Sequence, residues 1–279
     1  MGQPTDEPAG HYDRVTRAWG YLLGPELHYG LFGRPDEPLS DATVRLTERM
    51  AEAARLEPGL DVLDVGCGTG TPAMWIAERH GCAVLGISNS EVGVELARLR
   101  AVERGLDQRC RFQLGDGVQN GLPDRAFDRA WILESSHLMP RKSDLIRESA
   151  RILQPGGRLA LCDIILHRDL GLQEVLRHAK EFHLLRLVFG RAKMETLATY
   201  EAWMQDAGLV VDVCDDLSET SRPTFDRWRE NARRYESEVT ELIGREGWQQ
   251  FTESCDVLDA FWERRTLGYG LMAAYKPEP

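Results

Sequence analysis

One apolar run that ends in a glycine-rich turn restricts the fold of this chain more than any other feature. Residues 62–65 lead into the turn Gly66–Gly70, and a helical pattern begins at Thr71 and Pro72. Proline is tolerated in the first turn of a helix, where its missing N–H would have no partner. Glycines let the backbone approach a ligand closely, and free N–H groups at a helix start attract anionic groups. The pattern predicts a strand, a ligand-binding turn and a helix.

The same alternation of strand and helix continues along the chain, and each of the next apolar runs is expected to be followed by a helix. Such repeats favour a parallel sheet with helices packed on it, so the expected fold class is α/β. Two more strand patterns lie near the end of the chain. The strand-like runs are residues 61–66, 83–88, 111–116, 127–134, 157–166, 209–215 and 266–277.

Helical patterns precede and interrupt this predicted sheet. Residues 1–56 are expected to form an N-terminal helical cap, and residues 57–279 the core. Two long helical stretches, at about 168–206 and 224–265, are far longer than ordinary connections. They are expected to be insertions that act as lids on the core.

Charge and hydropathy exclude several classes of partner. The formal net charge of −11 disfavours nucleic acid and anionic membrane surfaces, whose binding depends on positive charge. No stretch approaches the roughly 18 uncharged apolar residues of a membrane span, and no secretion leader is evident, so we expect a cytoplasmic protein. The six cysteines contain no Cys-x-x-Cys pair. They are expected to be buried reduced thiols, and no metal site is indicated.

The spacing of the glycines points to one kind of nucleotide-like ligand. A dinucleotide fingerprint reads G-x-G-x-x-G, whereas Gly66–Gly70 reads G-x-G-x-G and follows Asp64. With its ordered strands, this string resembles motif I of the class I S-adenosyl-L-methionine (SAM) methyltransferases. A nicotinamide or flavin site is the alternative.

The resemblance implies a Rossmann-like, seven-stranded, mostly parallel sheet. It also implies SAM as the cofactor and S-adenosyl-L-homocysteine as its product. By the same resemblance, the backbone of Gly66, Cys67 and Gly68 would contact the cofactor, and Asp64 would bind its amino end or hold the glycine turn.

The ends of the second and third strands supply further expected cofactor contacts. The family usually has an acid after the second strand that accepts hydrogen bonds from the ribose, where this chain has Ser88 and Asn89. Serine can bond a hydroxyl without charge assistance. After the third strand, the resemblance assigns Asp116 and Gly117 to the adenine ring. A simple Asp-Gly turn is the alternative for these two residues.

Polar side chains also lie at the end of the fourth strand and within the fifth strand. Because the carboxyl ends of parallel strands meet at one edge, Glu134, Ser135, Ser136, His137 and Asp163 are expected to converge there. A histidine can accept a proton near neutral pH, and a neighbouring carboxylate fixes its tautomer and stabilises the imidazolium. His137, Asp163 and Glu134 are therefore the candidate catalytic residues, and Glu134 and Ser135 are also candidate cofactor ligands. A histidine that only shapes the pocket is the alternative.

Two further strings narrow the resemblance to a branch of the family that acts on small molecules. The sequence E-S-S-H-L-M-P at 134–140 is similar to the branch that includes rebeccamycin sugar O-methyltransferase, tocopherol methyltransferases and sarcosine methyltransferases. In that branch the histidine is assigned as a base. The string L-H-Y-G at 27–30 resembles a segment that covers the methionine end of the cofactor. This implies the same role for Tyr29 and for Tyr12 ahead of it, with simple packing as the alternative.

The predicted lids leave the acceptor and the assembly open. The segment 177–193 carries a basic face that would suit an anionic acceptor or simply face solvent. The aromatic residues of 224–265 could wall a bulky substrate or form a contact in a homo-oligomer.

The predicted function is O-methylation of a small, bulky and hydrophobic metabolite of specialised metabolism, with His137 as the general base. One alternative is C- or N-methylation, for example of a prenyl diphosphate. A second is a pericyclic ring closure by an enzyme that keeps SAM bound without consuming it. A cyclase would turn over without releasing S-adenosyl-L-homocysteine.

Overall fold

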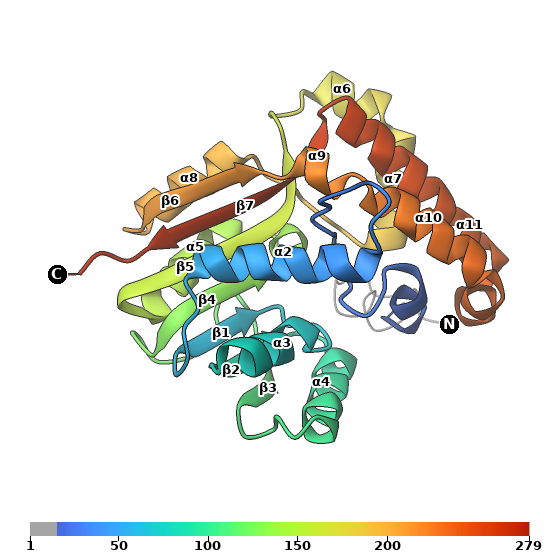
Figure 1. Ribbon diagram of the computed structural model, residues 1–279. Coiled ribbons are helices and arrows are strands. Elements are labelled where there is room, and N and C mark those ends of the chain that lie inside the picture. The colour runs from blue at the N-terminus through green and yellow to red at the C-terminus, as the bar shows by residue number, and fades with distance from the viewer. Residues whose placement is uncertain (1–15, 279) are drawn as a thin grey trace, which may run out of the picture. The chain divides into compact units, whose positions relative to one another are not determined.

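The computed structural model describes residues 16–278, and these contain a seven-stranded sheet (Figure 1). The strand order is β3-β2-β1-β4-β5-β7-β6, in which β1 to β5 pair in parallel and β6 pairs antiparallel with β7. The predicted Rossmann-like, mostly parallel α/β fold is confirmed. The strands are β1 Asp61–Val65, β2 Ala83–Ser88, β3 Cys110–Leu114, β4 Phe127–Leu133, β5 Leu153–Leu166, β6 Val210–Asp216 and β7 Leu267–Tyr275.

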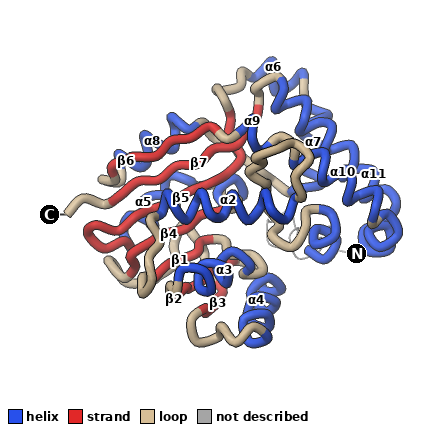
Figure 2. The backbone as a smooth tube through the Cα atoms, in the orientation of Figure 1, coloured by secondary structure: helices blue, strands red, loops and turns tan. Residues whose placement is uncertain are grey.

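Helices alternate with these strands and also form the late insertion (Figure 2). Residues 16–22 are helical, ahead of the first labelled helix. The helices are α2 Leu39–Ala54, α3 Thr71–His80, α4 Glu91–Glu103, the 3-10 turn η1 Ser136–Leu138, α5 Lys142–Ile152, α6 Leu172–Arg177, α7 Ala179–Phe189, α8 Leu197–Asp206, α9 Ser218–Ser221, α10 Thr224–Arg234 and α11 Glu236–Glu263.

The chain divides into two compact units. In the part that the structure describes, the first unit runs to Leu46 and adds Ile165–Thr196 and Leu217–Tyr269. The second unit, called the sheet unit below, comprises Thr47–Ile164, Leu197–Asp216 and Gly270 onward. The sheet unit therefore contains the glycine turn and the ends of β1 to β4.

Side-chain alternation along the strands builds a core on each face of the sheet unit. On one face, Leu63, Ile132 and Leu161 are fully buried against α5 and α8. On the other face, Phe112 packs near the start of α3, and α4 covers β2 and β3. Burying each large apolar side chain contributes roughly 1.5–3 kcal/mol. Near-continuous apolar strands are typical of parallel sheets covered on both faces.

The expectation that a helix follows every strand is wrong between β3 and β4. Residues 115–126 form turns instead (Figure 2). Gly121 has a φ of +69°, and the Asn120 side chain accepts a hydrogen bond from the backbone N–H of Leu122 at 2.9 Å. Side chains that bond the local backbone favour turns over helices. The predicted helical stretch 168–206 is likewise interrupted, because Gly190 ends α7 with a φ of +88°.

The aromatic residues of the late insertion are largely buried inside the first unit. The Tyr29 ring stacks on Trp262 at 5.5 Å between centroids and lies 4.8 Å from Trp228 and 4.9 Å from Tyr269. Phe225 meets it edge-on at 5.7 Å. Such aromatic pairs contribute about 0.5–1.5 kcal/mol beyond area burial. The cluster is therefore a core of this unit.

Two smaller features concern cysteines and membranes. Five cysteines are buried, but Cys214 is exposed, so the expectation of burial is wrong for that residue. It lies on β6, the edge strand, whose side chains alternate between partly buried and exposed. Among the described residues, no helix has the length and apolar character needed to cross a bilayer.

Candidate active site

The glycine turn after β1 is held against the ends of β2 and β4. The N–H groups of Gly66 and Cys67 both donate to the carbonyl of Ile87, at 2.8 and 3.0 Å. Gly66 has a φ of +84°, and a Cβ there would lie 2.3 Å from the Cβ of Ser135. Only glycine satisfies both conditions. The Ser135 hydroxyl donates to the carbonyl of Val65 at 2.7 Å and fixes this approach.

Asp64 carries a buried carboxylate without an evident partner for one of its oxygens. The residue is 3% exposed, and its Oδ2 has no hydrogen-bond partner among the described residues. Burial raises the pKa of Asp64 to about 7. Buried polar atoms are normally satisfied, and an orphan points to a bound group, because leaving it unpaired costs about 1–3 kcal/mol.

The residues after β2 form the start of α4. Ser88 is buried, and its hydroxyl oxygen accepts from the N–H of Ser90 at 3.2 Å, while Asn89 is exposed. The Ser90 hydroxyl caps α4 by accepting from the N–H of Gly93 at 3.0 Å. A Cβ on Gly93 would lie 3.0 Å from the carbonyl oxygen of Gly68. The absence of a side chain at 93 therefore lets α4 approach the glycine turn.

The residues after β3 form a turn that reaches the end of β1. The exposed Asp116 accepts a hydrogen bond through Oδ1 from the N–H of Val118 at 2.9 Å. Gly117 is buried, and a Cβ there would lie 2.7 Å from Val65 Cγ1. The carboxyl ends of β1, β2 and β3 thus gather the glycine turn, Ser88 and the Asp116–Gly117 turn in one unit.

His137 and Asp163 meet at the ends of β4 and β5, as the sequence predicted. The Nδ1 atom of His137 lies 2.6 Å from Asp163 Oδ1, and the backbone N–H of His137 donates to Asp163 Oδ2 at 3.0 Å. His137 is 8% exposed and Asp163 is fully buried. A carboxylate only accepts hydrogen bonds, so the contact assigns the ring proton to Nδ1 and leaves Nε2 as the acceptor.

The charges of neighbouring groups shift the pKa values of His137 and Asp163. Burial lowers the pKa of His137, but the charge and hydrogen bond of Asp163, helped by Glu134, outweigh burial and leave the pKa above its usual value. Burial raises the pKa of Asp163, but the imidazole and the surrounding donors outweigh it and leave this pKa below its usual value. Asp163 is therefore ionised at neutral pH, and its charge favours the protonated form of His137.

Glu134 adopts a backbone conformation that is rare for a side chain of its kind. Its φ is +47°, and its N–H donates to the carbonyl of Cys162 at 2.9 Å. A non-glycine residue in this region costs about 1–3 kcal/mol, and such residues cluster at functional sites. The conformation ends β4 and turns the chain into η1, where His137 lies.

Ser136, which the sequence places at this edge, and Tyr200, which the sequence does not connect with it, belong to the same cluster. The Ser136 hydroxyl donates to Asp163 Oδ2 at 2.5 Å and lies 2.7 Å from the Tyr200 hydroxyl. Tyr200 comes from α8, and no sequence signal near it points to the site. Of the predicted cofactor residues, Tyr29 lies in the aromatic core of the first unit, and Tyr12 lies outside the described residues.

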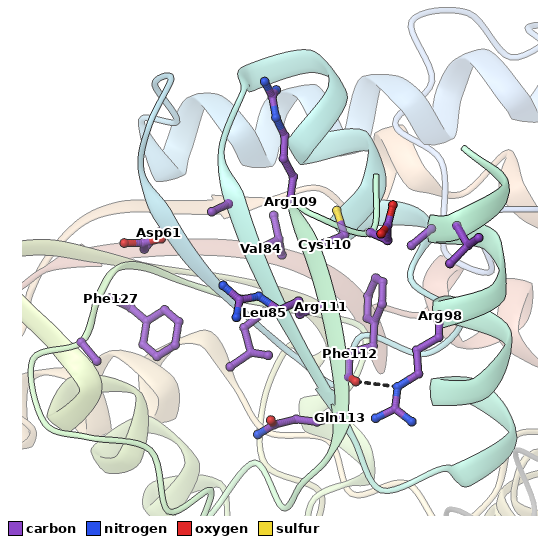
Figure 3. A pocket seen from close by; sticks show the side chains of 15 residues that line it. Asp61, Val84, Leu85, Arg98, Arg109, Cys110, Arg111, Phe112, Gln113 and Phe127 are labelled. Carbon is purple, nitrogen blue, oxygen red and sulfur yellow. Dashed lines mark hydrogen bonds between the residues drawn. The ribbon is translucent and has the colours of Figure 1, made fainter. Parts of the chain in front are cut away.

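A cavity of about 660 Å³ in the sheet unit is not this site (Figure 3). Its lining includes Asp61, Val84, Arg109 and Phe127, which lie in the first halves of β1, β2 and β4 or at the start of β3. The glycine turn and His137 follow the opposite, carboxyl ends of these parallel strands. In open α/β sheets, ligands bind at the carboxyl ends.

Known proteins resemble this chain over its whole length. A family model described as a methyltransferase domain matches residues 63–161. The chain is 36% identical over 280 residues to 27-O-demethylrifamycin SV methyltransferase of Amycolatopsis mediterranei (strain S699), with 100% of each chain covered. The chain belongs to the class I SAM-dependent methyltransferases.

Further matches include a second methyltransferase and a cyclase of similar structure. Methyltransferase GfsG of Streptomyces halstedii is 36% identical over 220 residues, which cover 78% of each chain. The crystal structure of the cyclase SpnF superposes with a TM-score of 0.83 at 26% identity and full coverage of both chains. The protein is thus a SAM-dependent methyltransferase of specialised metabolism, and the prediction of this family is confirmed. Among residues 16–278, no group of three or more His, Cys, Asp or Glu side chains is placed to hold a metal ion.

Proposed function

We propose that this methyltransferase transfers a methyl group to a hydroxyl oxygen of a small, bulky and hydrophobic metabolite, with His137 as the general base. The observation that carries the proposal is the buried contact of 2.6 Å between His137 Nδ1 and Asp163 Oδ1. It leaves Nε2 free to accept a proton from a hydroxyl group. The name of the relative from Amycolatopsis, 27-O-demethylrifamycin SV methyltransferase, supports an oxygen acceptor.

The residues at the ends of β1 to β3 fit SAM as the cofactor. The unpaired Asp64 oxygen suits its ammonium group, and the Ser88 hydroxyl suits a ribose hydroxyl. Gly66 and Gly68, both with positive φ, form a tight turn whose backbone carries no side chain at these two positions. Asp116 and Gly117 are suited to the adenine amino group and ring. SAM supplies a methyl group on a positively charged sulfur, which is a strong electrophile.

The chain's own residues handle the proton of the acceptor. His137 Nε2 accepts the hydroxyl proton as the oxygen becomes methylated, and the resulting imidazolium is stabilised by the ionised Asp163. Glu134 adds a second negative charge near the ring. Holding the acceptor oxygen in line with the methyl group supplies much of the remaining rate enhancement.

The carboxylate of Asp64 makes cofactor affinity depend on pH. Its pKa of about 7 means that Asp64 must lose a proton before it can pair with an ammonium group. We expect the affinity for SAM to rise by up to about tenfold per pH unit between about pH 5.5 and 7. Calorimetric titration of SAM across this range measures the slope. Asp64→Asn should bind more weakly and show a flat profile, and a flat profile in the wild type would contradict the pairing.

The same shift has a consequence for folding stability without the cofactor. The pKa of Asp64 is higher in the folded state than in the unfolded state. Its contribution to the free energy of unfolding is therefore fully present below about pH 4, where the carboxyl group is protonated in both states. It is lost as the pH rises through about 7.

Two substitutions at Asp116 separate adenine binding from turn formation. Asp116→Ala removes both the acceptor for Val118 and the carboxylate, and should weaken SAM binding about tenfold. Asp116→Asn keeps an oxygen for the Val118 N–H but loses the charge. If Asp116 binds adenine, the asparagine variant also loses several-fold in affinity. A wild-type dissociation constant in Asp116→Asn would assign the residue to the turn alone.

A cyclase is the second candidate, because the similarity to SpnF is 26% identity over the whole of both chains. Cofactor consumption separates the two functions. The enzyme is incubated with SAM and a panel of hydroxylated polyketides, aromatic glycosides and prenyl diphosphates, and both products are quantified by mass spectrometry. Methyl transfer predicts one S-adenosyl-L-homocysteine for each methylated product. An isomerised product of unchanged mass, formed without S-adenosyl-L-homocysteine, would favour the cyclase.

A further inference from the structure

We propose that the hydroxyl groups of Ser136 and Tyr200 form a buried relay of hydrogen bonds to Asp163, which limits how strongly this carboxylate stabilises protonated His137 and so increases the share of the neutral, proton-accepting form. The inference rests on the proposed function of His137 as a base. Ser136 and Tyr200 would be positioning residues, because they act on His137 only through Asp163.

The relay joins three secondary structure elements of the sheet unit. Ser136 begins η1 after β4, Asp163 lies on β5, and Tyr200 lies on α8. Asp163 follows Leu159 and Leu161 on the face of the sheet that α5 and α8 cover, which brings it within reach of α8. Ser136, Asp163 and Tyr200 are all fully buried, so water does not compete for these hydrogen bonds.

The direction of each hydrogen bond follows from the number of protons available. Asp163 is ionised and only accepts, so the single hydroxyl proton of Ser136 points to Asp163 Oδ2, at 2.5 Å. The Ser136 oxygen must then accept from the Tyr200 hydroxyl, which lies 2.7 Å away. The donors therefore run in one direction, from Tyr200 through Ser136 to the carboxylate. Bonds in such a chain polarise and strengthen one another.

Among residues 16–278, four donors contact the carboxylate of Asp163 and occupy both of its oxygens. Oδ2 accepts from the Ser136 hydroxyl and from the His137 backbone N–H at 3.0 Å. Oδ1 accepts from the His137 ring at 2.6 Å and from the Ile164 N–H at 2.8 Å. Donors to one carboxylate compete for its charge. Each donor other than the ring therefore weakens the electrostatic stabilisation that Asp163 gives to protonated His137.

This effect of the hydroxyl groups matters because the charged groups near His137 shift its pKa in opposite directions. Asp163 on β5 and Glu134 at the end of β4 favour the imidazolium, whereas Lys142 on α5 opposes it. A histidine that stayed protonated at working pH could not accept a proton from the acceptor. The hydroxyl relay from α8 keeps the neutral form populated while Asp163 still orients the ring.

A direct measurement of the His137 pKa tests the relay without reference to turnover. Histidine is labelled with carbon-13 at Cε1, the seven histidines are titrated by NMR, and His137→Gln identifies the resonance of interest. In Ser136→Ala the pKa of His137 should rise by about 0.5–1 pH unit. In Tyr200→Phe, which keeps the ring and removes only the hydroxyl, it should rise by less. In the double variant the rise should equal that of Ser136→Ala alone, because Tyr200 acts through Ser136.

Ser149→Ala is the matched control. Ser149 on α5 is also buried in the sheet unit, but its hydroxyl finds no hydrogen-bond partner among the described residues. The pKa of His137 should be unchanged in this variant. Circular dichroism establishes that each variant is folded, and Tyr200→Phe keeps the test decisive if Ser136→Ala does not fold.

The outcomes separate failure of the relay from failure of the proposed function. An unchanged or lowered His137 pKa in the folded variants would overturn the relay, as would equal shifts from Tyr200→Phe with and without Ser136. The pH profile of turnover should move in parallel, with its acid limb shifted upward by the same amount. If His137→Ala kept full turnover, the proposed base would fail, whereas the NMR titration would still decide the relay.

Discussion

His137→Ala is expected to lower kcat/KM for a hydroxyl acceptor by about 10²–10⁴-fold, the range for loss of a positioned general base. The SAM dissociation constant should stay within about twofold, because His137 is not among the predicted cofactor residues. Steady-state kinetics and calorimetry measure the two quantities. The loss should be largest near neutral pH and smaller at high pH, where hydroxide competes as the base.

His80→Ala provides the control for this result. His80 ends α3 in the same unit, at the amino-terminal end of the sheet, and its ring is tilted against that of Trp75, with 5.2 Å between the ring centroids. Its removal should leave turnover unchanged. Full activity in His137→Ala, or equal losses in both variants, would contradict the assignment of His137 as the base.

Gly66→Ala is expected to have the largest effect on stability, about 2–5 kcal/mol in the free energy of unfolding. A φ of +84° strains any other residue, and the new Cβ would lie 2.3 Å from Ser135 Cβ. Urea denaturation measures the loss. SAM binding should also weaken, because the turn cannot shift away from β4 without displacing the N–H groups bonded to Ile87.

Two comparisons distinguish the steric clash of a Cβ at residue 66 with Ser135 from the backbone strain of a positive φ. Gly59 has a φ of +86° but no atom within 4 Å of its added Cβ, so Gly59→Ala should cost only about 1–2 kcal/mol. In a Ser135→Gly background, the cost of Gly66→Ala should fall toward that value. Equal costs at Gly59 and Gly66 in the wild-type background would show that the contact with Ser135 is unimportant.

The local parts of the fold could be predicted because neighbouring residues determine them. The strand, glycine turn and helix around Gly66–Gly70 follow from apolar residues, glycines and a proline within one short segment. The meeting of His137 and Asp163 could also be predicted, since parallel strands place their carboxyl ends together. The helix expected between β3 and β4 is wrong because Gly121 and Asn120 stabilise turns that the periodicity did not reveal.

Long-range packing could not be predicted in the same way. Tyr200 is 64 residues from Ser136 in sequence, and only the docking of α8 on the sheet brings the two hydroxyls together. The surroundings of Tyr29 could not be predicted for the same reason, because its aromatic partners come from the late insertion and from β7. A single sequence indicates which residues are buried or polar, but not which distant residue completes a hydrogen bond.

The most direct test of the proposed O-methylation uses SAM labelled with carbon-13 in its methyl group. After incubation with the acceptor panel, the carbon-13 NMR spectrum of the purified product identifies the atom that received the label. O-methylation predicts a single methoxy signal that disappears with His137→Ala. A label attached to carbon or nitrogen, or an unlabelled isomerised product, would contradict it.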